Sequence, residues 1–199
     1  MYGLSNVESN RTPFPLSNGV TNVELKSCSY VDGGSWEAID FVYGRTTDDG
    51  ESTLKDRMFA VNEANISPSS FIENDTKEAA VDREAKRLNT RLKHIATKFS
   101  ISPNTLLSVT GKDFREYAEA YCKIVNSHCK GVKLYCKTVK DASGYVKIAK
   151  YPNFLQRMDS GECELKYTER ELAANVSNSP TNGAVKETRN VDSADSWTK

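Results

Sequence analysis

The chain has 199 residues, of which 38% are hydrophobic, and this supply fills the core of one compact domain but not of two large ones. Its 27 basic residues balance its 27 acidic residues, which counts against a nucleic-acid binder that relies on a global excess of positive charge. No apolar run approaches the roughly 20 residues that span a bilayer, and residues 1–16 lack the cationic start and apolar stretch of a secretory signal, so neither a membrane protein nor a secreted one is expected.

The first ordered elements are expected to be strands. Residues 1–20 mix Asn, Ser, Pro and Gly without periodicity, which predicts an irregular arm. Alternating or β-rich composition predicts three strands, at residues 23–30, 36–43 and 54–61. Residues 32–35 and 48–51 are rich in Asp and Gly, which tolerate positive φ, and predict the connecting turns. In the third strand, alternation places Lys55, Arg57 and Phe59 on one face and Leu54 and Met58 on the other.

A helical block follows the third strand. Its longest apolar stripe has residues spaced alternately four and three apart, namely Val81, Ala85, Leu88, Leu92, Ile95 and Phe99. Asp75 and Glu78 form a candidate capping box at the start of this helix. Ser102 followed by proline predicts a short helical turn, and a further helix is expected from near Thr110 until Gly131. The helical insertion therefore covers about 74–130.

Two more strands complete the predicted fold, at residues 132–139 and 145–149, joined by a short Gly-containing loop. Five strands with helices between the third and the fourth follow the order of an OB fold. We therefore expect a mainly β, α+β domain over residues 21–165, built as a five-stranded OB-type barrel. A polar tail over residues 166–199 is expected to be disordered. A generic α+β domain is the alternative, because strand count alone does not determine topology.

Charge is segregated along the chain. The segment 130–157 holds seven basic residues and one acidic residue, Asp141, which gives it a net charge of +6. Residues 158–199 hold eight acidic and five basic residues, a net charge of −3. The neutrality of the chain is thus a sum of opposed blocks, and the basic block suits a ligand that carries phosphates.

The predicted strand 132–139 places lysines and a tyrosine on its outward face. On the next strand, a tyrosine and a lysine again alternate with residues that suit the core. Lysines neutralise phosphates and aromatic rings stack on bases, a combination that suits single-stranded nucleic acid. The candidate binding residues are Lys133, Tyr135, Lys137, Lys140, Tyr145, Lys147, Lys150 and Tyr151. Alternatively, the Lys-Tyr-Lys pattern only keeps an exposed sheet face soluble and blocks edge pairing. Phe154 is expected to close one end of the barrel.

Several segments resemble one protein family. They are the strand at residues 23–29, the run 57–61, Phe114 with Tyr117, and the closing run 131–155 with its Gly-Tyr-Val-Lys-Ile-Ala-Lys-Tyr-Pro-Asn-Phe-Leu stretch. Over residues 20–165 the chain is similar to the single-stranded DNA-binding proteins of tailed bacteriophages, of the OB-fold type with a helical insertion found in phages of gut bacteria. The resemblance implies coating of displaced strands during DNA replication and recombination, in the cytoplasm of a bacterial host. It also implies contacts of an acidic tail with phage replication proteins, but residues 191–199 are only weakly acidic here.

These observations predict a non-sequence-specific single-stranded DNA-binding protein. The alternative is a phage structural or protein-interaction module on a similar β-scaffold, favoured by the zero net charge and by the long helical insertion. No enzyme is expected, because neither histidine has the surroundings of a catalytic group, and His94 is expected to be solvated near Arg91 and Lys93. Gly111 with Lys112 lacks the upstream glycine of a phosphate-binding loop.

The five cysteines show no Cys-x-x-Cys spacing, which is typical of free thiols in a reducing cytoplasm. Four residues offer ligand types for zinc, namely Cys122, His128, Cys129 and Cys136. Structural zinc sites usually rely on two closely spaced ligand pairs, which are missing from this sequence, and cysteines that pack as small apolar side chains explain the same pattern. No cofactor is therefore expected.

Overall fold

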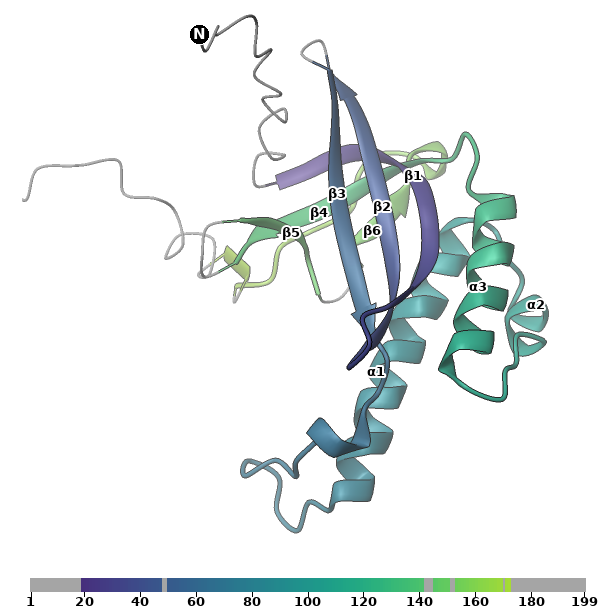
Figure 1. Cartoon of the computed structure of the whole chain (residues 1–199). Helices are drawn as coiled ribbons and strands as arrows, with labels where there is room; N and C mark the ends of the chain where they lie inside the picture. Colours follow the sequence, from purple (N-terminus) through teal and green to yellow (C-terminus); the bar gives the residue numbers. More distant parts are fainter. Residues whose placement is uncertain (1–18, 48–49, 142–144, 151–152, 170, 173–199) are drawn as a thin grey trace, which may run out of the picture.

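The computed structural model describes residues 19–47, 50–141, 145–150, 153–169 and 171–172 (Figure 1). Its strands are β1 (Gly19–Asp32), β2 (Glu37–Thr47), β3 (Gly50–Phe59), β4 (Lys133–Lys140), β5 (Val146–Ile148) and β6 (Leu155–Arg157). Its α-helices are α1 (Lys77–Lys98), α2 (Pro103–Leu107) and α3 (Phe114–His128), and short 3-10 helices lie at Glu63–Asn65 and Met158–Ser160. The mixed α+β class, the five predicted strands and the helical insertion are confirmed, while β6 is an addition.

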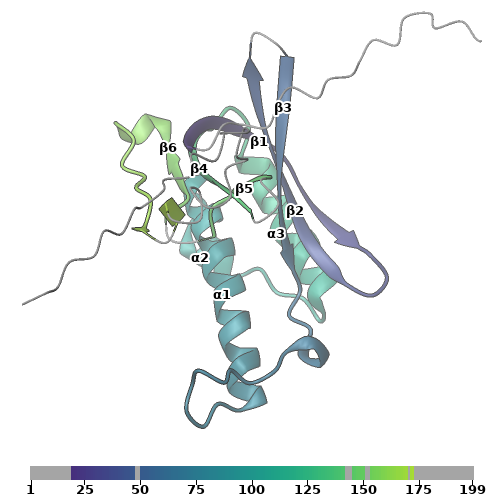
Figure 2. The same cartoon turned by 90° about the vertical axis from the view of Figure 1, so that its left-hand side faces the viewer.

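The strands form one antiparallel sheet in the order β3-β2-β1-β4-β5, and β6 also pairs with β4. The first half of β4 pairs with β6, through Cys136 opposite Leu155, and the second half pairs with β5, through Thr138 opposite Ile148. In Figure 2, β2 and β3 lie on one side of the molecule and β4 and β6 on the other. The sheet is open, since no ladder joins β3 to β5 among the residues that the structure describes.

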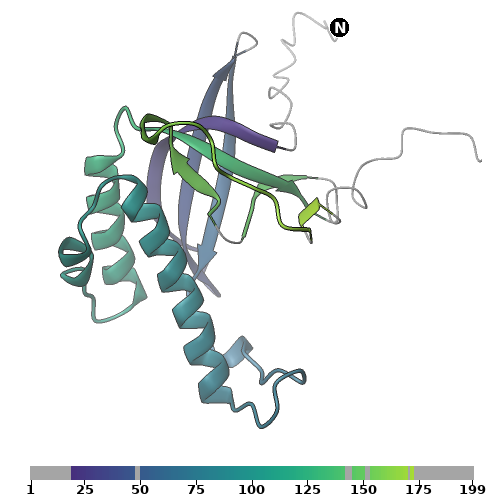
Figure 3. The same ribbon diagram turned by 180° about the vertical axis from the view of Figure 1, so that it is seen from behind.

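The core lies between the inner face of the sheet and the helices α1 and α3, which run beside it (Figure 3). Leu54 and Met58 are buried while Lys55 and Phe59 point to the outer side, as alternation predicts. The Tyr121 hydroxyl of α3 donates to the Leu92 carbonyl of α1 at 2.7 Å, which ties the two helices together. In the described part of the chain, no helix is long and apolar enough to cross a membrane.

Side-chain caps determine where the helices begin. Thr76 caps α1 by accepting from the Ala79 N–H at 3.1 Å, so the predicted capping box at Asp75 is wrong by one residue. Ser102 caps α2, with proline at its first turn as predicted. Asp113 caps α3 by accepting from Glu116, so this helix begins later than expected.

A side chain of α3 replaces a missing strand along one stretch of β1. The ladder between β1 and β4 ends at Glu24, and β1 bends at a bulge between Leu25 and Ser27. Beyond the bulge, the Cys28 N–H donates to Asn126 Oδ1 at 2.9 Å, and Asn126 Nδ2 donates to the Cys28 carbonyl at 2.7 Å. The carboxamide of Asn126 therefore forms the two hydrogen bonds that a neighbouring strand would form.

Candidate nucleic-acid interface

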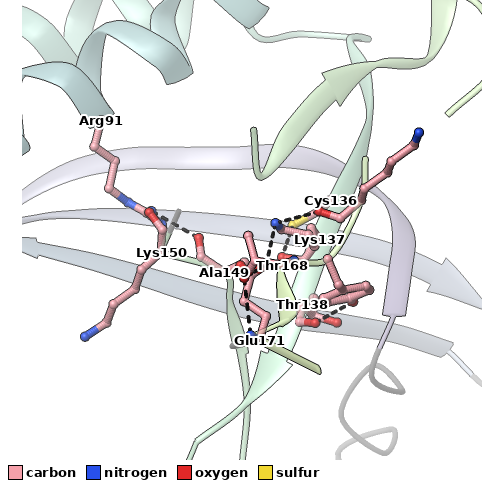
Figure 4. A network of polar contacts seen from close by, with 10 residues as sticks. Arg91, Cys136, Lys137, Thr138, Ala149, Lys150, Thr168 and Glu171 are labelled. Atoms are coloured by element: carbon pink, nitrogen blue, oxygen red, sulfur yellow. Dashed lines mark hydrogen bonds and ion pairs between the residues drawn. The ribbon is translucent and has the colours of Figure 1, made fainter. Parts of the chain in front are cut away.

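The outward face of β4 is largely covered. Leu134, Cys136 and Thr138 are buried, as their parity predicts, but Lys137 on the opposite face is also fully buried, at 0% exposure. Its ammonium donates to the Lys166 carbonyl at 3.1 Å and to Glu171 Oε2 at 2.9 Å (Figure 4). The expectation that Lys137 is solvent-exposed is therefore wrong. The reason is that a polar segment far along the chain folds back over this face.

Backbone and side-chain bonds hold this covering segment, residues 158–169 and 171–172, in place. The Tyr167 hydroxyl donates to the Thr138 carbonyl at 2.6 Å. Thr168 and Glu171 form a capping box, with the Glu171 N–H donating to Thr168 Oγ1 at 3.2 Å and the Thr168 N–H to Glu171 Oε2 at 2.8 Å. The folded part of the chain thus extends past residue 165, which is the end of the domain predicted from the sequence. The rest of the predicted tail, residues 173–199, lies outside the described residues.

Glu171 is held in its ionised form. Burial raises the pKa of this carboxyl, but hydrogen bonds from the Thr168 backbone and from Lys137 lower the pKa more, so that it lies below the ordinary value of 4.5. A negative Glu171 is what the buried ammonium of Lys137 requires as its partner.

The other predicted binding residues differ in their exposure to solvent. Lys133 is exposed at the beginning of β4, Tyr135 and Lys140 are half-buried, Tyr145 and Lys147 are exposed on the β4–β5 hairpin, and Lys150 is exposed after β5. Lys147 pairs with Asp141 at 2.6 Å. Tyr151 lies outside the described residues. The burial of Lys137 therefore interrupts the basic-aromatic face that the sequence predicts on β4 and β5.

Away from the face of β4 and β5, a concave site lies between α1, the end of β3 and the turn between β1 and β2. It is a cleft of about 1290 Å³, here called the α1–β3 groove, and of the predicted binding residues that the structure describes, only Lys150 lines it. Its walls also include Trp36, Phe59 and Phe154. A cleft of this size, lined by aromatic rings and by charged residues of both signs, is the default place for a ligand.

Two aromatic rings form one wall of the α1–β3 groove. Trp36 and Phe59 meet edge to face, with ring centroids 5.5 Å apart, and Phe59 is 54% exposed. Phe59 stays uncovered because its cross-strand neighbour on β2 is the small Ala38. The Arg57 guanidinium lies 4.6 Å from the centre of the Trp36 ring, so the two residues stack.

Arg57 is fixed by a carboxylate behind the rings. It donates to both carboxylate oxygens of the buried Asp40, at 2.7 and 2.8 Å. The hydrogen bond from Arg57 lowers the pKa of Asp40, which keeps this carboxyl ionised. The Trp36 ring is therefore positioned by a charged network before any ligand arrives.

The opposite wall is a basic stripe on α1, formed by Arg83, Arg87 and Arg91 at helical spacing with Lys86 beside them. Arg91 is structural, because it donates to the Lys150 carbonyl at 2.8 Å (Figure 4). It also donates to Asp56 at 2.7 Å and lies over the ring of Phe154. The stripe connects α1 to the sheet through this residue.

Three cations remain for a ligand. Arg83 is engaged by both oxygens of Asp75, whereas Arg87 only meets Glu84, its neighbour on the helix surface. In the part of the chain that the structure describes, the ammonium groups of Lys86 and Lys150 form no ion pair. Lys86, Arg87 and Lys150 can therefore contact an anion without breaking a strong internal bond.

His94 lines the groove as a neutral residue. Its Nε2 atom is buried and has no hydrogen-bond partner among the described residues, and its ring packs against Phe154 at 4.8 Å. Burial, followed by the charges of Lys98 and Arg91, lowers the pKa of His94 to about 4. The expectation that this histidine is solvated is wrong, since α1 packs it against the segment that follows β5.

The candidate zinc ligands are not brought together. Cys122 lies against Cys28 of β1, with the sulfur atoms 3.1 Å apart, and the hydrogen bond between them and burial raise the pKa of Cys28 well above its ordinary range. Cys136 is fully buried in the sheet, where burial also raises its pKa. Within the described ranges, no three His, Cys, Asp or Glu side chains gather closely enough to hold a metal ion.

Comparison of the chain with known protein families, curated proteins and solved structures found no match. The apolar stripe of α1, from which the helix is predicted, gives no indication of the groove. A second signal was present, since the helix carries arginines at intervals of four, and Arg57 shares the outward face of its strand with Phe59.

Proposed function

We propose that this protein binds single-stranded DNA in the α1–β3 groove, without reading its sequence and without catalysing a reaction. The observation that carries the proposal is that the exposed Phe59 ring and its Trp36 neighbour line the same groove as Lys86 and Lys150 and as Arg87, whose ion pair is with an exposed neighbour on the helix. Bases stack on exposed rings, and cations on the walls neutralise the phosphates that follow.

The preference for single strands follows from the position of the rings. Phe59 and Trp36 lie in a concave wall, where only an unstacked base can place its flat face against them. In duplex DNA the base faces are covered by their neighbours in the stack. The groove therefore favours a displaced strand over a duplex that presents the same number of phosphates.

The scaffold supports an OB-type interpretation. The strand order β3-β2-β1-β4-β5, with the helices inserted between β3 and β4, is the order of an OB barrel in which β3 and β5 would meet. With the family resemblance of the sequence, it supports a role in phage DNA replication or recombination in a bacterial host, next to phage replication proteins.

Replacing Phe59 with alanine should weaken the binding of an oligothymidine strand by about 5- to 150-fold, because one stacked base contributes ~1–3 kcal/mol. Folding should be preserved, since the ring is 54% exposed. The matched control is Tyr145→Ala, which removes a 68% exposed ring from the β4–β5 hairpin. Fluorescence anisotropy measures both affinities. A loss confined to Tyr145→Ala would move the site to the hairpin predicted from the sequence.

Salt dependence tests the cationic part of the site. Contacts of Lys86, Arg87 and Lys150 with phosphates should give a slope of about −2 for the logarithm of the binding constant against that of the salt concentration, at about −0.7 per contact. Lys86→Ala should flatten the slope by about 0.7, whereas Lys123→Ala on the exposed side of α3 should leave it unchanged. A slope near zero, or equal affinity for duplex DNA, would contradict the proposal.

The second candidate function is that of a protein-interaction module. It is favoured by one observation outside the groove, the 96% exposure of Phe71 in the loop before α1. If the protein binds no oligonucleotide at low salt, the protein-interaction function is favoured over DNA binding.

A further inference from the structure

The loop before α1 and the first turns of that helix project beyond the sheet (Figures 1 and 3). This projection, residues 67–82, is here called the tip. It displays two large apolar side chains, Phe71 at 96% exposure and Ile72 at 44%. Neither residue lines the α1–β3 groove of its own chain. An apolar pair displayed in this way marks a contact surface.

The tip is held in one conformation. Asp75 accepts from the Ser69 N–H at 2.6 Å and from both terminal nitrogens of Arg83, at 2.9 and 2.7 Å. The bond from Arg83, followed by that from Ser69, lowers the pKa of Asp75 to about 2, so the carboxylate stays charged under ordinary conditions. Phe71 and Ile72 are thus presented by a loop held by these hydrogen bonds, so the loop loses less conformational entropy when a partner binds.

Charge along this part of the chain is divided at Arg83. The tip holds four acidic residues, Glu73, Asp75, Glu78 and Asp82, against one basic residue, Lys77. Residues 83–98, which include the basic wall of the groove, hold six basic residues and one acidic residue. The tip is therefore opposite in charge to the α1 wall of the groove, whereas the whole groove is lined by six basic and five acidic residues. Both the tip and the groove carry exposed apolar side chains.

We propose that copies of this chain associate head to tail, with the tip of one copy seated in the α1–β3 groove of the next. Phe71 meets the rings of Trp36 and Phe59, and Glu73 lies toward Lys86 and Arg87. The acidic tip with its apolar pair is complementary to the basic α1 wall and the aromatic wall of the groove, and because Phe71 and Ile72 do not line the groove of their own chain, a second copy supplies the match. Because such a contact uses different surfaces on the two partners, its repetition builds open chains or closed rings.

The inference goes beyond DNA binding and is tested without DNA. Sedimentation of the full chain at low salt should show a mass that rises with concentration and falls when salt is added. Phe71→Ala should weaken the association by at least about tenfold, because burying a phenylalanine contributes that much or more. Leu107→Ala is the matched control, since it truncates a 79% exposed side chain on α2 and should change nothing.

A mixing experiment tests the head-to-tail geometry. Phe71→Ala inactivates the tip, and the double variant Phe59→Ala, Lys86→Glu inactivates the groove, so each protein alone should be monomeric. A mixture should form dimers and nothing larger, because only one intact tip can meet one intact groove. Circular dichroism confirms that the variants are folded. A monomeric wild-type protein, oligomers that survive Phe71→Ala, or an unassociated mixture would each overturn the inference.

The outcome is separable from the proposed function. Association without DNA binding would keep the head-to-tail contact and remove the DNA-binding proposal, and DNA binding by a protein that stays monomeric would do the reverse. If both hold, a tip and a DNA strand can occupy one groove only in turn.

Discussion

Replacing Lys137 with alanine should destabilise the protein by about 3 kcal/mol, the low end of the range for breaking a buried ion pair. The ammonium is fully buried, whereas the Glu171 side chain is 15% exposed and regains water more easily. The loss should concentrate in the covering segment, because Lys137 holds both the Lys166 carbonyl and the Glu171 carboxylate. Urea unfolding measures the loss in the free energy of unfolding. Hydrogen exchange of the Thr168 and Glu171 amides shows whether the loss lies in the covering segment.

The control keeps the volume and removes the charge. Lys137→Met should lose less than the alanine variant, since the methionine still fills the space on β4. A low pH should destabilise the covering segment in the same way as the mutation, because it protonates Glu171. The pKa of Glu171 is lowered on folding, so its contribution is complete above the ordinary value of 4.5 and disappears as the pH falls through the folded pKa. Unchanged exchange of these amides in Lys137→Ala would mean that other contacts hold the segment.

Lys137 also shows where interpretation of the sequence succeeds and where it fails. Alternation predicted β4 and its inward face because Leu134 and Cys136 pack on one core. The other face was expected to meet water, since its lysines and tyrosine are polar. What covers it is a polar segment with no apolar periodicity, held by single hydrogen bonds from Tyr167 and Lys137. Contacts of that kind leave no pattern along the chain.

Elements with long periodic segments were the predictable ones. The apolar stripe of α1 correctly predicts the burial of Leu92, Ile95 and Phe99, while Val81 at the projecting end is only half-buried. The strand β6 has three residues, too few to show any period, and it exists because β4 offers a free edge to Leu155.

The candidate site was less predictable than the fold. Lys150 was identified from the basic block of its segment, and the structure places it in the α1–β3 groove. The partners of Lys150 there come from a turn, from the end of β3 and from α1, which lie far apart in the sequence. Only the packing of α1 against the sheet, through Arg91, brings Trp36 and Lys86 into the same cleft.

Replacing Asn126 with alanine should destabilise the whole domain by about 2–4 kcal/mol. The mutation leaves the N–H and the carbonyl of Cys28 without partners, and each unsatisfied buried group costs roughly 1–3 kcal/mol. Cys28 is 3% exposed, so water does not readily replace the lost carboxamide. Because Asn126 joins α3 to β1 beyond the bulge, the loss should appear in global unfolding and not in a local opening.

Two companion variants identify the cause. Asn126→Asp keeps an acceptor for the Cys28 N–H but has no donor for the Cys28 carbonyl, and it places a charge beside that oxygen, so it should be at least as destabilising as alanine. Ser127→Ala, one residue along the same helix and exposed, should stay within about 0.5 kcal/mol of the wild type. Urea unfolding of the three variants, followed by circular dichroism, gives the comparison. An Asn126→Ala protein as stable as Ser127→Ala would mean that β1 satisfies its edge without α3, and that the bulge, rather than the carboxamide, ends its pairing with β4.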